Sequence, residues 1–336
     1  MADLRKDPVS GRWVIINTDN PTKPGDFEKF DESFKGGPCP FCYGSEDMTP
    51  PEIDVIRHEG TKPNTPGWQV RTVANKFPAL KIEGELDRSG IGIYDMSNGI
   101  GAHEVIIESP YHDKTITDLT DKEVSSVIKM YCRRSIDLQK DKRFKYLLIF
   151  KNHGISAGAS LEHSHTQLIA LPMIPKNVLE ELQGASAYYE FRERCIFCDI
   201  ARQELEEKER ILIESKYFIS FCPFVSRFPF EVHIMPKEHS NKFYELDDEQ
   251  RIDLAKILKE TLLRLKIALS EHAYNFIIHS VPVGKKDYDY YHWYIEIMPR
   301  LTRVAGFEWG TGFYLLPTPP EVAIKYLKAA TTEALK

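Results

Sequence analysis

Two Cys-x-x-Cys pairs occur in the 336-residue chain, and each is followed in the sequence by two well-separated histidines. Two thiolates and two imidazoles form a saturated tetrahedral ligand set of the kind that holds a structural zinc ion. A redox-active pair is the alternative function of a Cys-x-x-Cys segment, but it does not account for histidines at a similar spacing in both copies. The sequence therefore predicts two zinc ions per chain. The first ligand set is Cys39, Cys42, His112 and His163, and the second is Cys195, Cys198, His239 and His292.

The segment that begins at His163 also carries groups that could act on a phosphate. Its sequence is His163-Ser-His165-Thr-Gln167, and on a β-strand these three numbered side chains share one face. A histidine without a metal ion can attack phosphorus and form a phosphohistidine, while an amide can donate to a phosphate oxygen as charge develops. The preceding loop, residues 152–160, contains two glycines that allow close approach of a backbone to phosphate, and Ser160 adds a hydroxyl donor. We predict that His165 is the nucleophile, supported by Gln167 and Ser160; the alternative is that His165 is a structural core histidine.

The second half of the chain repeats the metal-binding histidine but not the nucleophile. Its segment reads His292-Trp-Tyr294-Ile-Glu296, so a tyrosine matches His165 and a glutamate matches Gln167. Neither a tyrosine nor a glutamate in these places reproduces the histidine and amide pair. We therefore predict phosphate chemistry in the first half only.

The same order of elements surrounds both ligand sets, which predicts an internal repeat. In each half a capped helix follows the first histidine, and then come a buried strand and a strand led by the second histidine. The capping signals are Thr120-Asp-Lys-Glu123 and Asp247-Asp-Glu-Gln250. Apolar residues at helical spacing follow both capping signals. They are Val124, Val127, Ile128 and Tyr131 in the first helix and Leu254, Leu258, Leu262 and Leu265 in the second. We predict two α+β units in tandem, at residues 1–172 and 173–336, each with an antiparallel sheet flanked by helices.

The charge and hydropathy of the sequence indicate which kinds of partner the protein does not bind. The 44 basic and 50 acidic residues give a formal net charge of −6, and no stripe of Lys and Arg occurs, so we expect no nucleic-acid partner. The first residues include acidic side chains and lack the apolar stretch that is typical of a signal peptide. Apolar runs elsewhere in the chain are too short to span a bilayer. We therefore expect a cytoplasmic protein with reduced cysteines and no membrane association.

Around His165 the sequence becomes similar to one family. The pattern Asn152…Gly158-Ala-Ser160…His163-Ser-His165-Thr-Gln167 resembles the active-site segment of the galactose-1-phosphate uridylyltransferase family. The resemblance covers essentially the whole chain, and further matching segments are residues 7–14, 75–80, 101–105 and 307–312. It implies a tandem repeat of histidine-triad-like units, usually assembled as a homodimer with active sites near the subunit interface.

The resemblance also implies a reaction and further site residues. In the family reaction the nucleophilic histidine, here His165, takes a nucleoside monophosphate from a nucleotide sugar and passes it to a second sugar 1-phosphate. The family pattern implies zinc at the first metal site and zinc or iron at the second. The residues it implies as substrate contacts, beside Ser160 and Gln167, are Asn75 and Phe77 for the nucleoside, Asn152 and Gly158 in the loop, and Gly310, Thr311 and Gly312 near the C-terminus.

Some positions depart from the best-known members of the family. Ser164 replaces a proline between the two histidines, Asn20 and Lys23 stand where those members have two arginines, and Lys76 replaces an acidic ribose contact. Ser164 and the Gly310-Thr-Gly312 segment are more similar to the adenylyl-sugar phosphorylase branch. We expect UMP transfer from UDP-glucose to galactose 1-phosphate. The alternatives are an ADP-glucose phosphorylase with the same covalent histidine, a hydrolase that discharges the intermediate to water, and a noncatalytic zinc scaffold.

Overall fold

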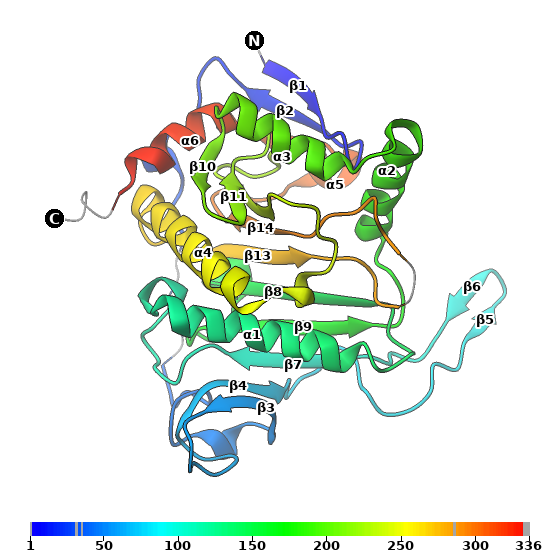
Figure 1. Ribbon diagram of the computed structural model, residues 1–336, viewed down its shortest axis with the longest axis vertical. Helices are drawn as coiled ribbons and strands as arrows, with labels where there is room; N and C mark the ends of the chain where they lie inside the picture. Colours follow the sequence, from blue (N-terminus) through cyan, green and yellow to red (C-terminus); the bar gives the residue numbers. More distant parts are fainter. Residues whose placement is uncertain (1, 31–32, 35, 285–286, 332–336) are drawn as a thin grey trace.

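A long antiparallel sheet organises the molecule (Figure 1). The computed structural model describes residues 2–30, 33–34, 36–284 and 287–331. Within these ranges ten strands form one sheet in the order β10-β11-β12-β14-β13-β8-β9-β7-β4-β3, and every neighbouring pair is antiparallel. The strands of the first half are β3 (Glu52–Arg57), β4 (Trp68–Ala74), β7 (Ala102–Ile107), β8 (Tyr146–His153) and β9 (His165–Leu171). Those of the second half are β10 (Ile211–Glu214), β11 (Phe218–Phe221), β12 (Val232–Pro236), β13 (Tyr274–His279) and β14 (Tyr294–Pro299).

The strand order shows the internal repeat. From the edge inward the first half runs β3-β4-β7-β9-β8 and the second runs β10-β11-β12-β14-β13, so corresponding strands take corresponding places. The halves meet at the centre, where β8 pairs with β13 and Lys151 lies opposite Phe276. The predicted α+β fold, a tandem repeat of antiparallel strands flanked by helices, is confirmed, with the sheets of the two halves joined into one. The division of the chain into domains at residues 172 and 173 stays a prediction.

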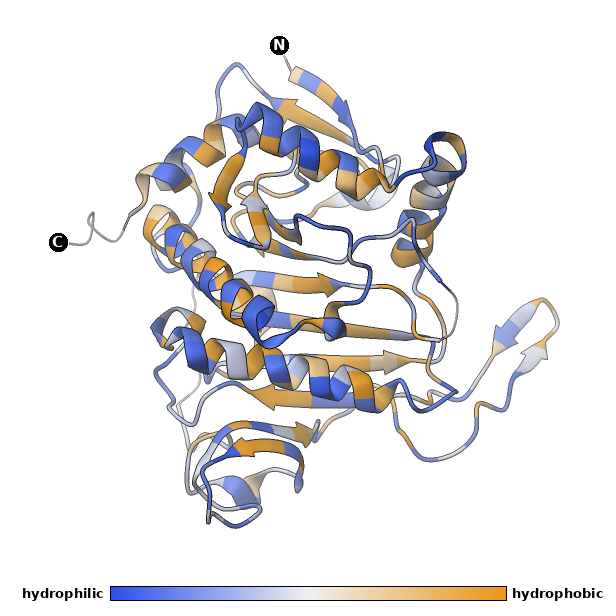
Figure 2. Cartoon of the chain, viewed as in Figure 1, coloured by the Kyte–Doolittle hydropathy of each residue, from blue (hydrophilic) through white to orange (hydrophobic). Residues whose placement is uncertain are grey.

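Both predicted helices begin at the expected capping signals. In α1 (Asp121–Leu138) the Thr120 side chain accepts from the backbone of Glu123, and in α4 (Asp248–Leu269) the Asp247 side chain accepts from that of Gln250. Such caps satisfy backbone donors that have no partner within the helix. The two helices lie side by side across one face of the sheet (Figure 1). Their apolar stripes are buried against alternate strand residues, and Figure 2 shows the strands as largely apolar and the helices as mixed.

The opposite face is covered differently in the two halves. In the second half, side chains such as Ile219 and Phe221 of β11 pack against α2 (Lys176–Arg192) and α3 (Ile196–Glu207). In the first half this face carries the strand residues that alternate with those packed under the helices. His165 and Gln167 of β9 are among them, and we call this face the open face. None of the helices in the described ranges is both long and apolar enough to cross a membrane.

Smaller elements complete the fold. Near the chain ends a small sheet combines β1 (Ala2–Lys6), β2 (Trp13–Asn17) and β15 (Tyr314–Leu316), flanked by α5 (Gly306–Thr311) and α6 (Pro320–Ala329). The hairpin of β5 (Ser89–Ile91) and β6 (Tyr94–Met96) extends away from the body of the protein (Figure 1). The short 3₁₀ helices are η1 (Pro24–Asp26), η2 (Glu46–Met48), η3 (Ile116–Asp118), η4 (Ile155–Ala157) and η5 (Phe243–Glu245).

Candidate active site and metal centres

The first predicted ligand set is brought together beside the start of β9. The sulfur of Cys39 lies 3.5 Å from Nδ1 of His163, and the sulfur of Cys42 lies 3.5 Å from Nδ1 of His112 and 3.6 Å from Nδ1 of His163. Zinc–sulfur bonds of about 2.3 Å and zinc–nitrogen bonds of about 2.0 Å at tetrahedral angles require a sulfur–nitrogen separation of roughly 3.5 Å. The Nε2–H of His163 donates to the carbonyl of Ser109 at 2.7 Å, which leaves Nδ1 free to ligate. The four side chains therefore fit a zinc ion.

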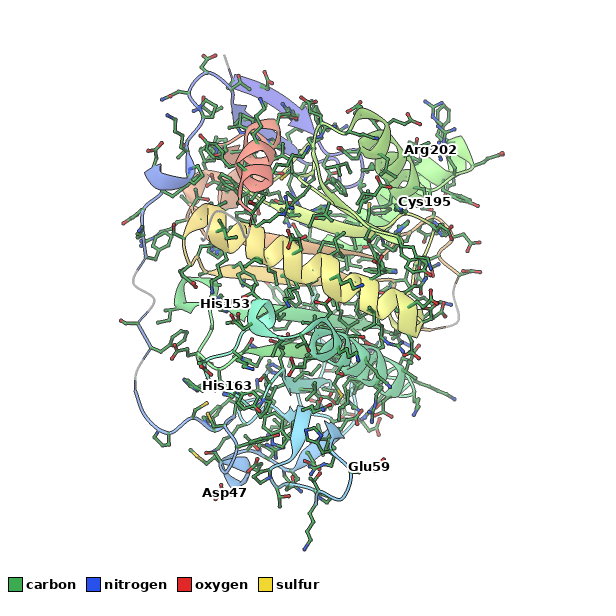
Figure 3. All side chains as sticks on the ribbon, turned by 60° about the vertical axis from the view of Figure 1, so that its left-hand side comes forward. Asp47, Glu59, His153, His163, Cys195 and Arg202 are labelled. Carbon is green, nitrogen blue, oxygen red and sulfur yellow. The ribbon has the colours of Figure 1, made fainter. Side chains whose placement is uncertain are left out.

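The second predicted set is also assembled, in the other half of the molecule. The sulfur of Cys198 lies 3.3 Å from Nδ1 of His239 and 3.5 Å from Nδ1 of His292, and Cys195 completes the group. The pKa of the Cys195 thiol is held low, first by a hydrogen bond from Cys198 and then by the two histidines. A thiolate is the form that binds a metal. Figure 3 labels one member of each set, with Cys195 in the upper part of the view and His163 in the lower part.

The predicted nucleophile is buried and oriented. His165 is 6% exposed, and its Nδ1–H donates to the carbonyl of His163 at 2.8 Å, so Nε2 carries the free electron pair. Burial lowers the pKa of the ring to about 4, which keeps it neutral and nucleophilic at pH 7. The ring of Phe41 packs against it with the centroids 5.3 Å apart. An imidazole held in this way can attack an electrophilic phosphorus.

A buried ion pair lies beneath the nucleophile, on the helix side of the sheet. The ammonium of Lys151 donates to Glu108 at 2.7 Å, to the hydroxyl of Ser164 at 2.9 Å and to the carbonyl of His165 at 3.1 Å. The Ser164 hydroxyl in turn donates to Glu108 at 2.6 Å, and Tyr131 donates to the same carboxylate at 3.0 Å. Although burial alone would raise the pKa of Glu108, Lys151 and the surrounding hydroxyls lower it. The residue that separates the two histidines is thus fixed by charge-assisted hydrogen bonds.

Neither Glu108 nor Lys151 is predicted from the sequence as part of the site. A lysine within the apolar run of β8 was the available signal, since a buried lysine requires a counter-charge. The identity of that partner depends on strand register, which places Ile107 opposite His165 and so brings Glu108 beneath Ser164.

Gln167 and Asn75 meet at the open face with a third side chain between them. Nε2 of His103 lies 2.8 Å from Oε1 of Gln167 and 3.1 Å from Nδ2 of Asn75. Asn75 also accepts at Oδ1 from the backbone of Phe77, whose ring is 84% exposed. Two of the predicted substrate contacts therefore share one cluster with Gln167. His103 was not predicted, because a single histidine within a strand carries no distinctive sequence signal.

The loop between β8 and β9 holds the other predicted contacts in the first half. Asn152 accepts from the amide of Asn275 at 2.8 Å, and its own amide lies 3.5 Å from the carbonyl of Gly158. Gly158 has a positive φ of 88°, a conformation that glycine adopts without strain. Ser160 is exposed on the same loop. The loop therefore places the Ser160 hydroxyl directly before the His163–His165 segment.

The substrate contacts predicted near the C-terminus lie away from His165. Gly310 and Thr311 belong to α5 and Gly312 ends it, and this helix packs against β15 in the small sheet. Figure 1 places α5 several strands away from β9. Within one chain these residues are not brought to His165, and their role as substrate contacts stays a prediction.

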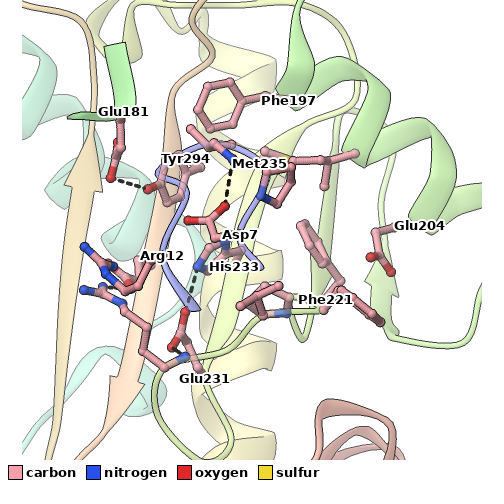
Figure 4. Close-up of a pocket in the computed structure, with 18 of the residues that line it drawn as sticks. Asp7, Arg12, Glu181, Phe197, Glu204, Phe221, Glu231, His233, Met235 and Tyr294 are labelled. Carbon is pink, nitrogen blue, oxygen red and sulfur yellow. Dashed lines mark hydrogen bonds and ion pairs between the residues drawn. The ribbon is translucent and has the colours of Figure 1, made fainter. Parts of the chain in front are cut away.

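The second half has a cavity at the place that corresponds to the open face (Figure 4). Its volume is about 330 Å³, and Tyr294, at the position of His165, donates to Glu181 at 3.2 Å. Glu296, at the position of Gln167, pairs with Arg227. Neither side chain is an imidazole or an amide, so these two positions of the second half lack the nucleophile and the amide donor of the first half.

Two family models match successive parts of the chain. Residues 48–175 match the galactose-1-phosphate uridyl transferase N-terminal domain family, and residues 181–335 match the corresponding C-terminal domain family. An ADP-glucose phosphorylase from Arabidopsis thaliana is 36% identical over 97% of this chain and 92% of its own. A galactose-1-phosphate uridylyltransferase from Thermotoga maritima is 28% identical over 99% of this chain and its full length. The crystal structure of an Arabidopsis thaliana ADP-glucose phosphorylase with bound ADP-glucose aligns with a TM-score of 0.83, at 34% identity, over 98% of this chain and all of that one.

Proposed function

Because the chain belongs to the galactose-1-phosphate uridylyltransferase family, we propose that it transfers a nucleoside monophosphate from a nucleotide sugar through a covalent intermediate on His165. The observation that carries this proposal is the orientation of the ring, with Nδ1–H bound to the carbonyl of His163 and Nε2 left as the nucleophile. The neutral state of this buried ring supports attack at neutral pH.

The reaction has two balanced steps. In the first, Nε2 of His165 bonds to the α-phosphorus while the bond from that phosphorus to the bridging oxygen breaks, and the electron pair leaves with the sugar 1-phosphate. The ring becomes positively charged, and the carbonyl that accepts from Nδ1–H stabilises it. In the second, an oxygen of the acceptor phosphate attacks the same phosphorus and returns the electron pair to Nε2. Gln167 and Ser160 donate to the phosphate oxygens as their charge grows.

We further propose that the nucleotide is adenosine-based and that the acceptor is inorganic phosphate, which makes the reaction ADP-glucose plus phosphate to ADP plus glucose 1-phosphate. From the sequence alone we expect UDP-glucose and galactose 1-phosphate. The higher identity to a relative named ADP-glucose phosphorylase favours the alternative, and so do Ser164 and the Gly310–Gly312 segment. UMP transfer to galactose 1-phosphate is the second candidate, supported by the family match and the Thermotoga relative.

The two Cys₂His₂ sets would hold zinc in this proposal, because two sulfurs and two nitrogens suit zinc. Zinc at the first site would fix His163, whose carbonyl orients His165. A saturated set leaves no position for substrate, so the role of both ions is structural. Iron at the second site is the alternative, and metal analysis decides between them.

A homodimer would cover aromatic side chains that are exposed on a single chain. Phe77 is 84% exposed and Trp309, in α5, is 78% exposed. A partner subunit that covered these two side chains would remove their apolar surface from water. We propose that α5, with Gly310–Gly312, approaches the site of a partner subunit. Light scattering on protein eluting from a size-exclusion column measures the mass of the assembly and so tests the proposed dimer. A monomeric mass at micromolar concentration would contradict the dimer.

The activity is tested by product analysis. Protein is mixed with ADP-glucose or UDP-glucose, each with phosphate or galactose 1-phosphate, and the products are separated and identified. We expect ADP and glucose 1-phosphate to form fastest. A preference for UDP-glucose with galactose 1-phosphate by more than about a hundredfold, roughly 2.7 kcal/mol, would establish the second candidate instead.

A further inference from the structure

The proposed reaction leaves His103 without a role, although this side chain contacts two of the groups that face the substrate. It stands on β7 next to β9, and its ring lies between Gln167 and Asn75. Its Nδ1 atom lies 3.2 Å from the backbone nitrogen of Ala79. Both ring nitrogens therefore lie within hydrogen-bond distance of polar groups, and the chemistry of these groups decides which nitrogen carries the proton.

Hydrogen-bond chemistry decides how these groups are oriented. A backbone N–H only donates, so Nδ1 of His103 accepts from Ala79, and the proton of the neutral ring is on Nε2. This Nε2–H donates to Oε1 of Gln167 at 2.8 Å. The NH₂ group of Gln167 is then turned away from the ring. The Asn75 amide is oriented by the backbone of Phe77, whose N–H donates to Oδ1 of Asn75. Its NH₂ group therefore faces Nε2 of His103 at 3.1 Å, and because both groups are donors no hydrogen bond forms between them.

We propose that His103 is a positioning residue that orients the amide of Gln167, so that its NH₂ group and not its carbonyl oxygen faces the phosphate bonded to His165. The inference deepens the proposed function and rests on it. The terminal torsion of a glutamine is roughly two-fold, so an unrestrained amide would present its oxygen about half of the time. A carbonyl oxygen repels a phosphate oxygen, whereas a donor already in place needs no reorientation as charge develops.

The competing explanation is that His103 only fills space between β7 and the Asn75–Ala79 segment. Two amide substitutions separate these explanations, since each reproduces one ring nitrogen. His103→Gln places an NH₂ group near the position of Nε2 and can still donate to Gln167. His103→Asn reproduces Nδ1, keeps an acceptor for Ala79, and loses the donor. The two variants are similar in volume and polarity, so a space-filling role predicts no difference between them.

The experiment measures the single-turnover rate at which His165 acquires label from nucleotide sugar labelled in the α-phosphate. We expect Gln167→Ala to slow labelling by about 10²-fold, as for the loss of one transition-state donor. His103→Asn should slow it by at least about tenfold with little change in nucleotide affinity, and His103→Gln should restore most of the rate. In the double variant His103→Asn/Gln167→Ala the rate should equal that of Gln167→Ala alone, because His103 acts only through that amide.

The exposed His58, away from the site, supplies the matched control. His58→Asn should label at the wild-type rate. The inference is overturned if His103→Asn labels like the wild type, if the Asn and Gln variants are slowed equally, or if the two effects multiply in the double variant. A wild-type protein that acquires no label would refute the proposed function itself. A labelled wild type with a fully active His103→Asn variant refutes only the role of His103.

Discussion

Lys151→Met removes the cation beneath the nucleophile and leaves the Glu108 carboxylate buried without its counter-charge. Both side chains are at most 2% exposed, and the ammonium makes three contacts within 3.1 Å. Loss of one member of a buried pair costs about 3–5 kcal/mol. Hydroxyls of Ser164 and Tyr131 still donate to the carboxylate, so we expect the lower end of this range.

The pH dependence of this cost gives a sharper test. In the wild type the pKa of Glu108 lies below its usual value, so its stabilising effect is present above about pH 4.5 and is lost as the pH falls through the lower, folded pKa. Without Lys151, burial dominates and raises that pKa. The variant then takes up a proton on folding and becomes more stable as the pH falls. The difference between wild type and variant should therefore shrink from pH 8 to pH 5.

Denaturant unfolding of the zinc-loaded protein at both pH values measures the effect. Lys140→Met is the matched control, because Lys140 forms a surface pair with Asp137 and is 71% exposed. Such pairs contribute less than about 1 kcal/mol. Glu108→Gln/Lys151→Met should recover part of the loss, since no charge stays buried. A Lys151→Met cost below about 1 kcal/mol, or a cost equal at pH 5 and pH 8, would refute the reasoning.

Three further predictions follow from the site. Labelling of His165 should be independent of pH between about 6 and 8, because the pKa of its ring is lowered to about 4; a rate that halves near the ordinary histidine pKa of about 6.5 would contradict this. Elemental analysis of protein purified without chelator should find about two metal equivalents, mainly zinc, whereas a content near zero with four free thiols in the paired cysteines would refute both sites. Cys39→Ser should reduce labelling far more than Cys195→Ser, since only the first site includes His163, and equal losses would show that the two sites are equally remote from the chemistry.

The sequence was most informative where residue types are chemically specific. Cysteine and histidine at duplicated spacings predicted both ligand sets, and the structure brings all eight side chains into two groups. The capped helices and the order of elements along each half were predictable for a related reason, since capping residues and apolar periodicity act locally.

Contacts across the sheet could not be predicted in the same way. The Glu108–Lys151 pair and the His103–Gln167 contact join residues 43 and 64 positions apart, and both depend on the register of β7 against β9. A shift of one residue would turn each side chain to the other face. The separation of α5 from β9 within a chain likewise follows from the packing of the small sheet, which no local pattern encodes.

The central claim is that His165 carries the nucleotide, and direct detection of that intermediate tests it most closely. Protein is incubated with nucleotide sugar labelled in the α-phosphate, without acceptor, digested, and analysed by mass spectrometry. Tyr294→Phe, at the matching position of the second half, serves as the control beside His165→Asn. We predict acid-labile, base-stable label on His165 in the wild type and in Tyr294→Phe, and none in a folded, zinc-loaded His165→Asn protein. Turnover retained in His165→Asn, or label on another residue, would contradict the account.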